Sequence, residues 1–229
     1  MTTVFPKEVT CALCGNEQTV QVMGSTNSFG SMDLDTRPPE MRRSTMGLWL
    51  QTCSGCGFVA ADLEEKSPSD ELAVATAGYR AESGNKSRLP LANQFVCRSI
   101  LDEAAGDLAS AGWRRLHAAW VCDDRQQDVE SRLLRLAAIE LFERSRVQGK
   151  PAVEKMAGGD ELLLCDLARR AGELPRALEY CAAGIALEVQ PFIRQLLELE
   201  QVLCVARDTT CHKVSEVDGS GGGASATMH

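Results

Sequence analysis

The sequence predicts an α+β protein in which a small cysteine-rich region with short strands precedes a mainly α-helical region. Aromatic residues form only 5% of the 229-residue chain, while alanine and leucine are plentiful, and this composition favours helices over a β-sandwich or barrel. Short segments with strand character gather before residue 67. Apolar residues then recur at helical spacing through most of the remaining chain.

Changes in composition divide the chain into four parts. Residues 1–66 contain the cysteine and glycine turns, and residues 67–90 are expected to form a linker with one short helix. Residues 91–208 are expected to be helical, and residues 209–229 have the composition of a flexible tail. With 44% hydrophobic and 24% charged residues, the chain is typical of a soluble globular protein with one ordinary domain and a smaller one.

Three short segments around the cysteine pairs are predicted to be strands. EQTVQVM (residues 17–23) alternates in polarity after the first pair, MGLWLQT (46–52) leads into the second pair, and GFVAADL (57–63) leaves it. Residues 28–44 are predicted to be an irregular loop, because the consecutive prolines at 38–39 are incompatible with a regular helix or strand.

About six helices are predicted between residues 91 and 208. Cys97, Leu101, Ala104 and Leu108 are spaced by four, three and four residues, which places them on one face of a helix. Glycines, prolines and a pair of aspartates are expected to separate the helices. The predicted breaks are at Gly112, Asp123-Asp124, residues 148–151, residues 158–160, Gly172 and Pro191.

Two copies of Cys-x-x-Cys-Gly, CALCG at residues 11–15 and CSGCG at 53–57, indicate a metal site. Two residues between the cysteines let one tight turn direct both sulfurs to one ion, and the following glycine permits the positive φ that the turn needs. Zn²⁺ takes four thiolates in a tetrahedron, and two such turns supply all four. The predicted ligands are Cys11, Cys14, Cys53 and Cys56.

Four protein ligands close the shell of a zinc ion, which predicts a structural rather than a catalytic site. The alternative is thiol redox chemistry, in which a Cys-x-x-Cys motif opens a helix after a buried strand. Here glycine and a strand-like segment follow each pair, which favours zinc. Five further cysteines fall in helical segments and are predicted to act as small buried apolar residues: Cys97, Cys122, Cys165, Cys181 and Cys204.

Residues 161–191 are comparable with the tetratricopeptide (TPR) repeat, a helix-turn-helix unit of ~34 residues with small residues where its helices touch. Residues 112–146 are a more distant second copy. Stacked helix pairs of this kind often form a groove that holds a partner's peptide, and the alternative is that the helices only pack together. The small residues of the first copy are Cys165, Ala177, Cys181 and Gly184, with Gly172 at the turn.

Together, these features resemble a family of bacterial proteins of unknown function that join an N-terminal zinc ribbon to TPR-like helices. The resemblance spans roughly residues 9–190, and it implies a fold but no established activity. The family usually has proline after the first cysteine of each pair, where this chain has Ala12 and Ser54. The segments that carry the resemblance are CALCG, DLDTRPPEM, LWLQTCSGCGFVAADL, LHAAW and DLARRAGELPRALEY.

Catalytic motifs are missing from the sequence, which predicts a protein that is not an enzyme. The chain has three histidines and contains no His-Glu-x-x-His, Gly-x-Ser-x-Gly or phosphate-binding loop. His117 is predicted to be a packed or surface residue of a helix rather than a base.

The charge of the chain bears on its partners. A net charge of −8 disfavours nucleic acid, which needs a local basic patch, although zinc ribbons also occur in nucleic-acid proteins. The N-terminus lacks the apolar core of a signal peptide, and no apolar run approaches the ~20 residues that span a membrane, so a cytoplasmic protein is expected.

The leading functional hypothesis is an adaptor without enzymatic activity, whose TPR-like helices bind a protein partner. Nucleic-acid association and thiol redox chemistry are the alternatives. The loop at residues 28–44 is a second candidate for partner binding, although its charges are also placed to pair with one another. The candidate loop residues are Asp33, Asp35, Arg37, Arg42 and Arg43.

Overall fold

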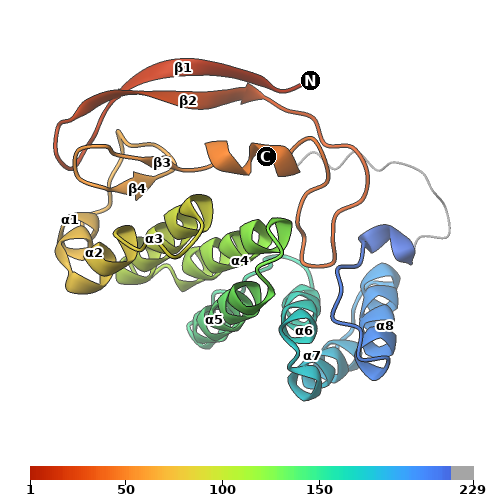
Figure 1. Ribbon diagram of the computed structural model, residues 1–229. Helices are drawn as coiled ribbons and strands as arrows, with labels where there is room; N and C mark the ends of the chain where they lie inside the picture. Colours follow the sequence, from red (N-terminus) through yellow and green to blue (C-terminus); the bar gives the residue numbers. More distant parts are fainter. Residues whose placement is uncertain (218–229) are drawn as a thin grey trace. The chain divides into compact units, whose positions relative to one another are not determined.

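The structure is a computed structural model that describes residues 1–217 (Figure 1). Within this range, small two-stranded sheets come first and α-helices form most of the remaining chain, with 53% of the residues helical. The α+β class predicted from the sequence is therefore confirmed.

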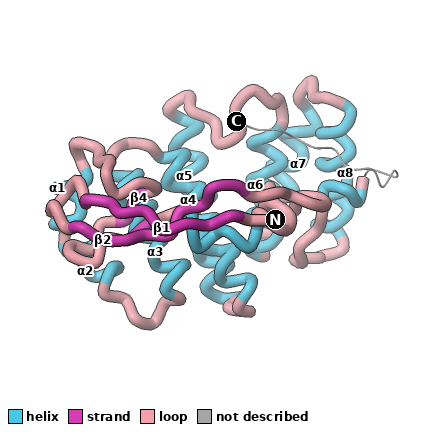
Figure 2. Tube along the Cα trace, turned by 90° about the horizontal axis from the view of Figure 1, so that it is seen from above, coloured by secondary structure: helices cyan, strands magenta, loops and turns pink. Residues whose placement is uncertain are grey.

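The strands form two separate pairs. β1 (Thr3–Thr10) pairs with β2 (Glu17–Ser25), and the two strands run alongside each other in Figure 2. β3 (Gln51–Thr52) pairs antiparallel with β4 (Val59–Ala60). A Cys-x-x-Cys turn joins the strands of each pair, so each cysteine pair lies at the closed end of a hairpin.

The predicted strands are only partly right. The expected strand at 17–23 is present in β2, but its partner β1 was not predicted, because Pro6 and the adjacent charged residues Lys7 and Glu8 give a weak strand signal. Of the segment 46–52, only the last two residues are a strand. A 3₁₀ helix, η1 (Arg43–Leu48), occupies its beginning.

Five helices follow the second cysteine pair: α1 (Asp70–Ala75), α2 (Ala77–Ser83), α3 (Pro90–Ala104), α4 (Leu108–Asp124) and α5 (Asp128–Val147). The predicted linker thus holds two short helices rather than one. Thr76 separates them, because its backbone is extended and its Oγ1 accepts a hydrogen bond from Tyr79 N at 3.2 Å, which starts the second helix.

The helix break predicted at Gly112 is wrong. α4 runs through Gly112, and the break falls earlier, at Gly106 and Asp107, where Gly106 has φ +76° and Asp107 accepts a hydrogen bond from Ser110 N. Gly112 is instead a contact point between helices. A Cβ at this position would lie 2.5 Å from the Phe142 ring of α5.

Three helices follow residue 158: α6 (Gly159–Ala171), α7 (Leu174–Ala186) and α8 (Pro191–Val205). They begin and end near the predicted breaks at residues 158–160, Gly172 and Pro191. A short 3₁₀ helix, η2 (Val214–Glu216), lies beyond them.

Residue contacts group the chain into two compact units. The cysteine unit consists of Thr3–Gly24 and Thr45–Glu154. The loop unit consists of Met1–Thr2, Ser25–Ser44 and the described residues from Lys155 onward. The loop at 28–44 therefore groups with α6 to α8 and not with the cysteine turns on either side of it. The domain boundaries expected from composition differ from those of the two units. Composition can divide the chain only into consecutive segments, whereas contacts group segments that are far apart in sequence.

Each unit has its own core. In the cysteine unit, α3, α4 and α5 pack side by side around large buried side chains such as Phe95, Trp120 and Phe142. In the loop unit, α6 packs against α7 and α8, and nearly all of its residues are buried.

Part of the expected tail is ordered by contacts with the loop at 28–44. Leu34 N donates to His212 O at 2.9 Å, Val214 N donates to Met32 O at 2.9 Å, and Asp33 forms an isolated bridge with Lys213. The expectation of a flexible tail does not hold for residues 209–217, and residues 218–229 lie outside the described range.

Among the described helices, none has both the length and the apolar character needed to cross a bilayer.

Candidate metal centre

The four cysteines of the two repeated motifs come together in the cysteine unit. Cys11 Sγ lies 3.8 Å from Cys56 Sγ, and Cys14 Sγ lies 3.6 Å from Cys53 Sγ. All four sulfurs lie within 4.8 Å of one another, and none of these cysteines is in a disulfide. Each close sulfur pair joins one residue from each turn, so the two turns interlock around a common centre.

These distances fit a tetrahedral metal ion. With Zn–S bonds of about 2.3 Å, the edge of a tetrahedron of sulfurs is about 3.8 Å. A disulfide would instead require a sulfur separation of about 2.05 Å. The cluster can therefore hold one metal ion through four sulfurs, and Cys11, Cys14, Cys53 and Cys56 are the residues that would bind it.

The two turns repeat the same backbone pattern. In the first, Gly15 N donates to Cys11 O at 2.8 Å and Cys11 N donates to Asn16 O at 2.9 Å. In the second, Gly57 N donates to Cys53 O at 2.9 Å and Cys53 N donates to Phe58 O at 2.8 Å. The two glycines have φ of +72° and +75°, as the repeated sequence predicts.

Backbone donors and burial act on the thiols in opposite directions. Burial raises the pKa of Cys11 and of Cys56. Burial also opposes the ionisation of Cys53, but hydrogen bonds from the backbone N–H groups of Cys56 and Gly55 outweigh it and lower the pKa of Cys53 to about 7. N–H groups that point at a sulfur in this way stabilise its thiolate form, and a thiolate is the form that binds a metal cation.

Gln18, in strand β2, links the two turns. Its Oε1 accepts hydrogen bonds from Ser54 N at 2.8 Å and Ser54 Oγ at 3.0 Å, and its Nε2 donates to Thr52 O at 3.0 Å. Asn16 Nδ2 also donates to Ser54 Oγ, at 3.2 Å. Sequence reasoning missed these positioning residues, because one glutamine in an alternating strand carries no signal of a remote partner.

Helices of the same unit support the second turn. Tyr79, on α2, is 1% exposed and donates its hydroxyl to Gly57 O at 2.8 Å. Gln94, on α3, donates to Leu50 O at 3.1 Å and to Thr52 Oγ1 at 2.9 Å. The carbonyl groups of Gly57 and Leu50 are therefore bound by side chains that follow the second cysteine pair in sequence.

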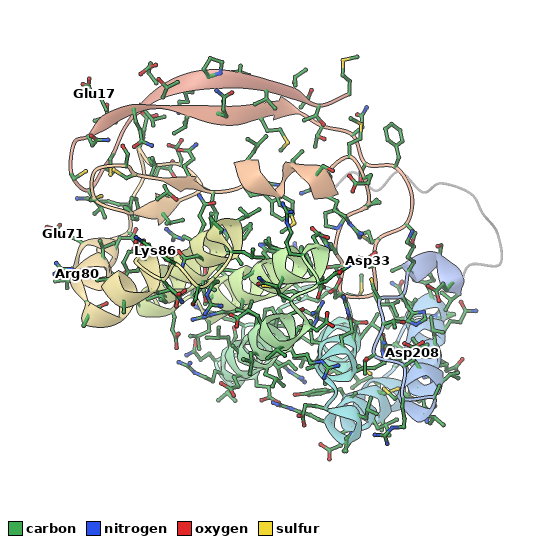
Figure 3. All side chains as sticks on the ribbon, viewed as in Figure 1. Glu17, Asp33, Glu71, Arg80, Lys86 and Asp208 are labelled. Atoms are coloured by element: carbon green, nitrogen blue, oxygen red, sulfur yellow. The ribbon has the colours of Figure 1, made fainter. Side chains whose placement is uncertain are left out.

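One side of the sulfur cluster is open to solvent. Cys11 and Cys53 are buried, whereas Cys14 is exposed and Cys56 is half-buried. Cys14 and Cys56 line a pocket of about 500 Å³ together with Tyr79 and residues of α1 and α2. Glu71 and Arg80, labelled in Figure 3, are two of these lining residues.

The candidate partner-binding residues of the loop are mostly buried. Asp33 pairs with Arg43, and Asp35, which is fully buried, pairs with Arg170 of α6 at 2.7 Å. The predicted pairing within the loop is therefore present for Asp33 and Arg43. Asp35 instead pairs with a residue of α6, and the sequence did not indicate this partner. Arg37 is 4% exposed and Arg42 is exposed.

His117 lies in an aromatic core. The rings of Trp49, Phe95, Trp113 and Trp120 surround it, with centroids 4.8 to 6.3 Å away. Burial, with a contribution from Arg114, lowers its pKa to about 3, and its Nδ1 has no hydrogen-bond partner. A histidine held neutral in this way is a packing residue, as predicted.

Comparisons with protein-family models, with curated proteins and with solved structures found no match to this chain. The fold and the cysteine cluster thus define a protein of small antiparallel sheets followed mostly by helices, with a four-sulfur site that could bind a metal ion.

Proposed function

We propose that the four-cysteine cluster binds one structural Zn²⁺ and that the chain is a cytoplasmic adaptor without enzymatic activity, whose TPR-like helices bind a protein partner. The observation that carries the metal assignment is the sulfur separation of 3.6 to 3.8 Å across the two turns. Zinc is the ion that most often fills a site of four thiolates in an irregular, glycine-rich hairpin pair, and with four protein ligands it has no open position for catalysis.

Two features of the cluster favour zinc over thiol redox chemistry. A redox pair places its two cysteines at the start of a helix, where the helix dipole activates one thiol. Here each pair lies in a hairpin turn, and each cysteine has a sulfur of the other turn within 3.8 Å. Four sulfurs within 4.8 Å of one another, two pairs of them near the edge length of a zinc tetrahedron, are arranged to bind one ion between the turns.

Support for the partner-binding helices comes from the packing of α6, α7 and α8. The residues predicted at the small positions of a TPR unit, Cys165, Ala177, Cys181 and Gly184, are all buried. A Cβ on Gly184 would lie 2.9 Å from Leu197, so α7 and α8 approach closely. On the other side of α8, Val202 and Val205 are 64% and 73% exposed, which leaves apolar surface for a partner.

The metal assignment is tested by Cys53→Ser. Serine is a poor zinc ligand, so the variant should contain one zinc fewer per chain by elemental mass spectrometry and should unfold at a lower temperature. Cys97→Ala, a buried cysteine outside the cluster, is the control and should keep its metal. An unchanged zinc content in Cys53→Ser would contradict the proposal.

The adaptor assignment is tested by a nuclease-treated pull-down of the full chain from its host cells. Val202→Glu on α8 should lose the recovered partner, and Leu72→Glu, at an exposed leucine of α1 outside both TPR-like segments, should keep it. If both variants recover the same proteins, the helices α6 to α8 do not bind the partner. Recovery of nucleic acid alone from an untreated extract would favour the nucleic-acid alternative.

A further inference from the structure

A second group of thiols lies in the core of the loop unit. Cys165 belongs to α6, Cys181 to α7, and Glu200 and Cys204 to α8, and all four are at most 3% exposed. The ligand atoms of Cys165, Glu200 and Cys204 lie within 4.8 Å of one another, with Cys165 Sγ 3.8 Å from Glu200 Oε2. This group is separate from the four cysteines of the repeated turns.

Helical spacing explains how two of the helices contribute. Glu200 and Cys204 are four residues apart on α8, so both side chains project from the same face. Cys165 and Arg169 are four residues apart on α6 and share a face in the same way. Facing helices with such pairs are the usual way in which a helical core assembles a metal site.

Cys181, on α7, is buried in the same core, and its Sγ donates to Leu197 O at 3.0 Å. Its sulfur is not one of the three ligand atoms that lie within 4.8 Å of one another. The other buried helical cysteines, Cys97 and Cys122, belong to no such group among the described residues.

Arg169 orients the carboxylate of the group. Its Nε donates to Glu200 Oε2 at 2.7 Å, and its Nη2 donates to Asp166 Oδ1 at 2.6 Å. Its Nη1 also donates to the backbone carbonyls of Asp208 and Thr210, at 2.7 and 2.9 Å. Asp208 is labelled in Figure 3. A carboxylate that binds a metal ion is commonly oriented by a hydrogen bond from another side chain. Here the buried guanidinium of Arg169 does this for Glu200, and it also offsets part of the negative charge of Glu200 and Asp166.

We propose that Cys165, Glu200 and Cys204 form a second zinc site between α6 and α8, and that the Cys181 thiol of α7 leaves the Leu197 carbonyl to complete the shell when the ion binds. Zn²⁺ accepts thiolates and a carboxylate together in a closed tetrahedral shell. Each thiol gives its proton to solvent as its bond to the metal forms. Three buried cysteines alone would be ordinary small apolar residues, but a buried glutamate beside them provides the charge that a cation needs.

This site is independent of the zinc site proposed for the repeated turns. The number of zinc ions per chain, measured in wild type and in variants of one site, distinguishes the two sites. The full chain is incubated with excess Zn²⁺ under anaerobic reducing conditions, desalted and measured by elemental mass spectrometry. Wild type should retain two zinc ions per chain and Cys204→Ala one. Cys122→Ala, which removes a buried helical cysteine outside both clusters, should retain two.

A second variant and a second ion keep the test decisive if Cys204→Ala does not fold. Glu200→Gln preserves the shape of the side chain and an acceptor for Arg169, and it should also retain one zinc. When Co²⁺ is titrated into wild type, the thiolate-to-cobalt absorption should rise until two equivalents have been added. In Glu200→Gln it should stop rising after one equivalent. One zinc per wild-type chain that Cys204→Ala also retains, or two zinc ions in Glu200→Gln, would overturn the proposal.

Discussion

Gly15 and Gly57 occupy equivalent places in the two cysteine turns, and both have a positive φ. A side chain in this left-handed region costs about 1 kcal/mol through its contact with the following carbonyl group. No atom lies within 4 Å of a Cβ built on Gly15, so the backbone alone determines the cost at that position.

We therefore expect Gly15→Ala to lower the free energy of unfolding by about 1 kcal/mol while the metal content stays unchanged. Chemical denaturation with parallel metal analysis measures both quantities. Gly47→Ala is the matched control, because that glycine also has open space around it and its φ is not positive. Equal stability of the two variants would show that the turn is not constrained in this way.

His117 predicts a dependence of stability on pH. Its pKa is lowered from 6.5 to about 3 in the folded protein, so the unfolded chain binds the proton more readily between these values. This contribution to stability is complete above pH 6.5 and declines as the pH falls, by about 1.4 kcal/mol per pH unit.

Between pH 7 and 5.5, wild type should therefore lose about 1 kcal/mol more stability than His117→Phe, which keeps an aromatic ring in the aromatic core. Urea denaturation at the two pH values measures this difference. If wild type and His117→Phe lose the same amount of stability between these pH values, the pH dependence comes from other groups.

At the scale of helices, the contact between α4 and α5 depends on the absence of a side chain at Gly112. An added Cβ would lie 2.5 to 3.0 Å from three atoms of the Phe142 ring, and Phe142 is fully buried. The ring has no room to move away, so the two helices must separate.

Gly112→Ala should therefore destabilise the protein by about 1 to 3 kcal/mol, despite the higher helix propensity of alanine. Gly78→Ala, at an exposed position of α2 with open space around the glycine, should be neutral or stabilising. Thermal unfolding of both variants tests the contact, and a stabilised Gly112→Ala would contradict it.

At the scale of the whole molecule, the cysteine turns depend on segments far along the chain. Tyr79 and Gln94 bind carbonyl groups on either side of the second cysteine pair, and Arg98 Nη1 donates to Val59 O at 3.2 Å. All three residues follow residue 66, where the composition changes. They belong to the same compact unit as the cysteines.

A fragment of residues 1–66 should bind metal but unfold without cooperativity, because it lacks these donors and about 65 residues bury little apolar surface. A fragment of residues 1–154 contains the entire cysteine unit and should unfold cooperatively in the presence of zinc. Chelator competition and thermal unfolding compare the two. Cooperative unfolding of the shorter fragment would show that the turns fold independently.

The sequence by itself determined the features that depend on local geometry. Two cysteines three positions apart with a following glycine favour a tight turn, so the four candidate ligands could be predicted, and they lie together. Most helix boundaries after residue 120 also follow from local periodicity and from glycine or proline, and the structure has them near the predicted positions.

Only the tertiary structure decided which distant residues meet. Gln18 joins the two turns, Arg170 pairs with an aspartate 135 residues earlier, and Gly112 is a contact point between helices rather than a break. The thiol and carboxylate group in α6 to α8 arises in the same way, from residues that are ordinary one at a time. The physical reason is that turns and helices depend on neighbours within a few residues, whereas partners across the fold are selected by packing and by the need to satisfy buried polar groups.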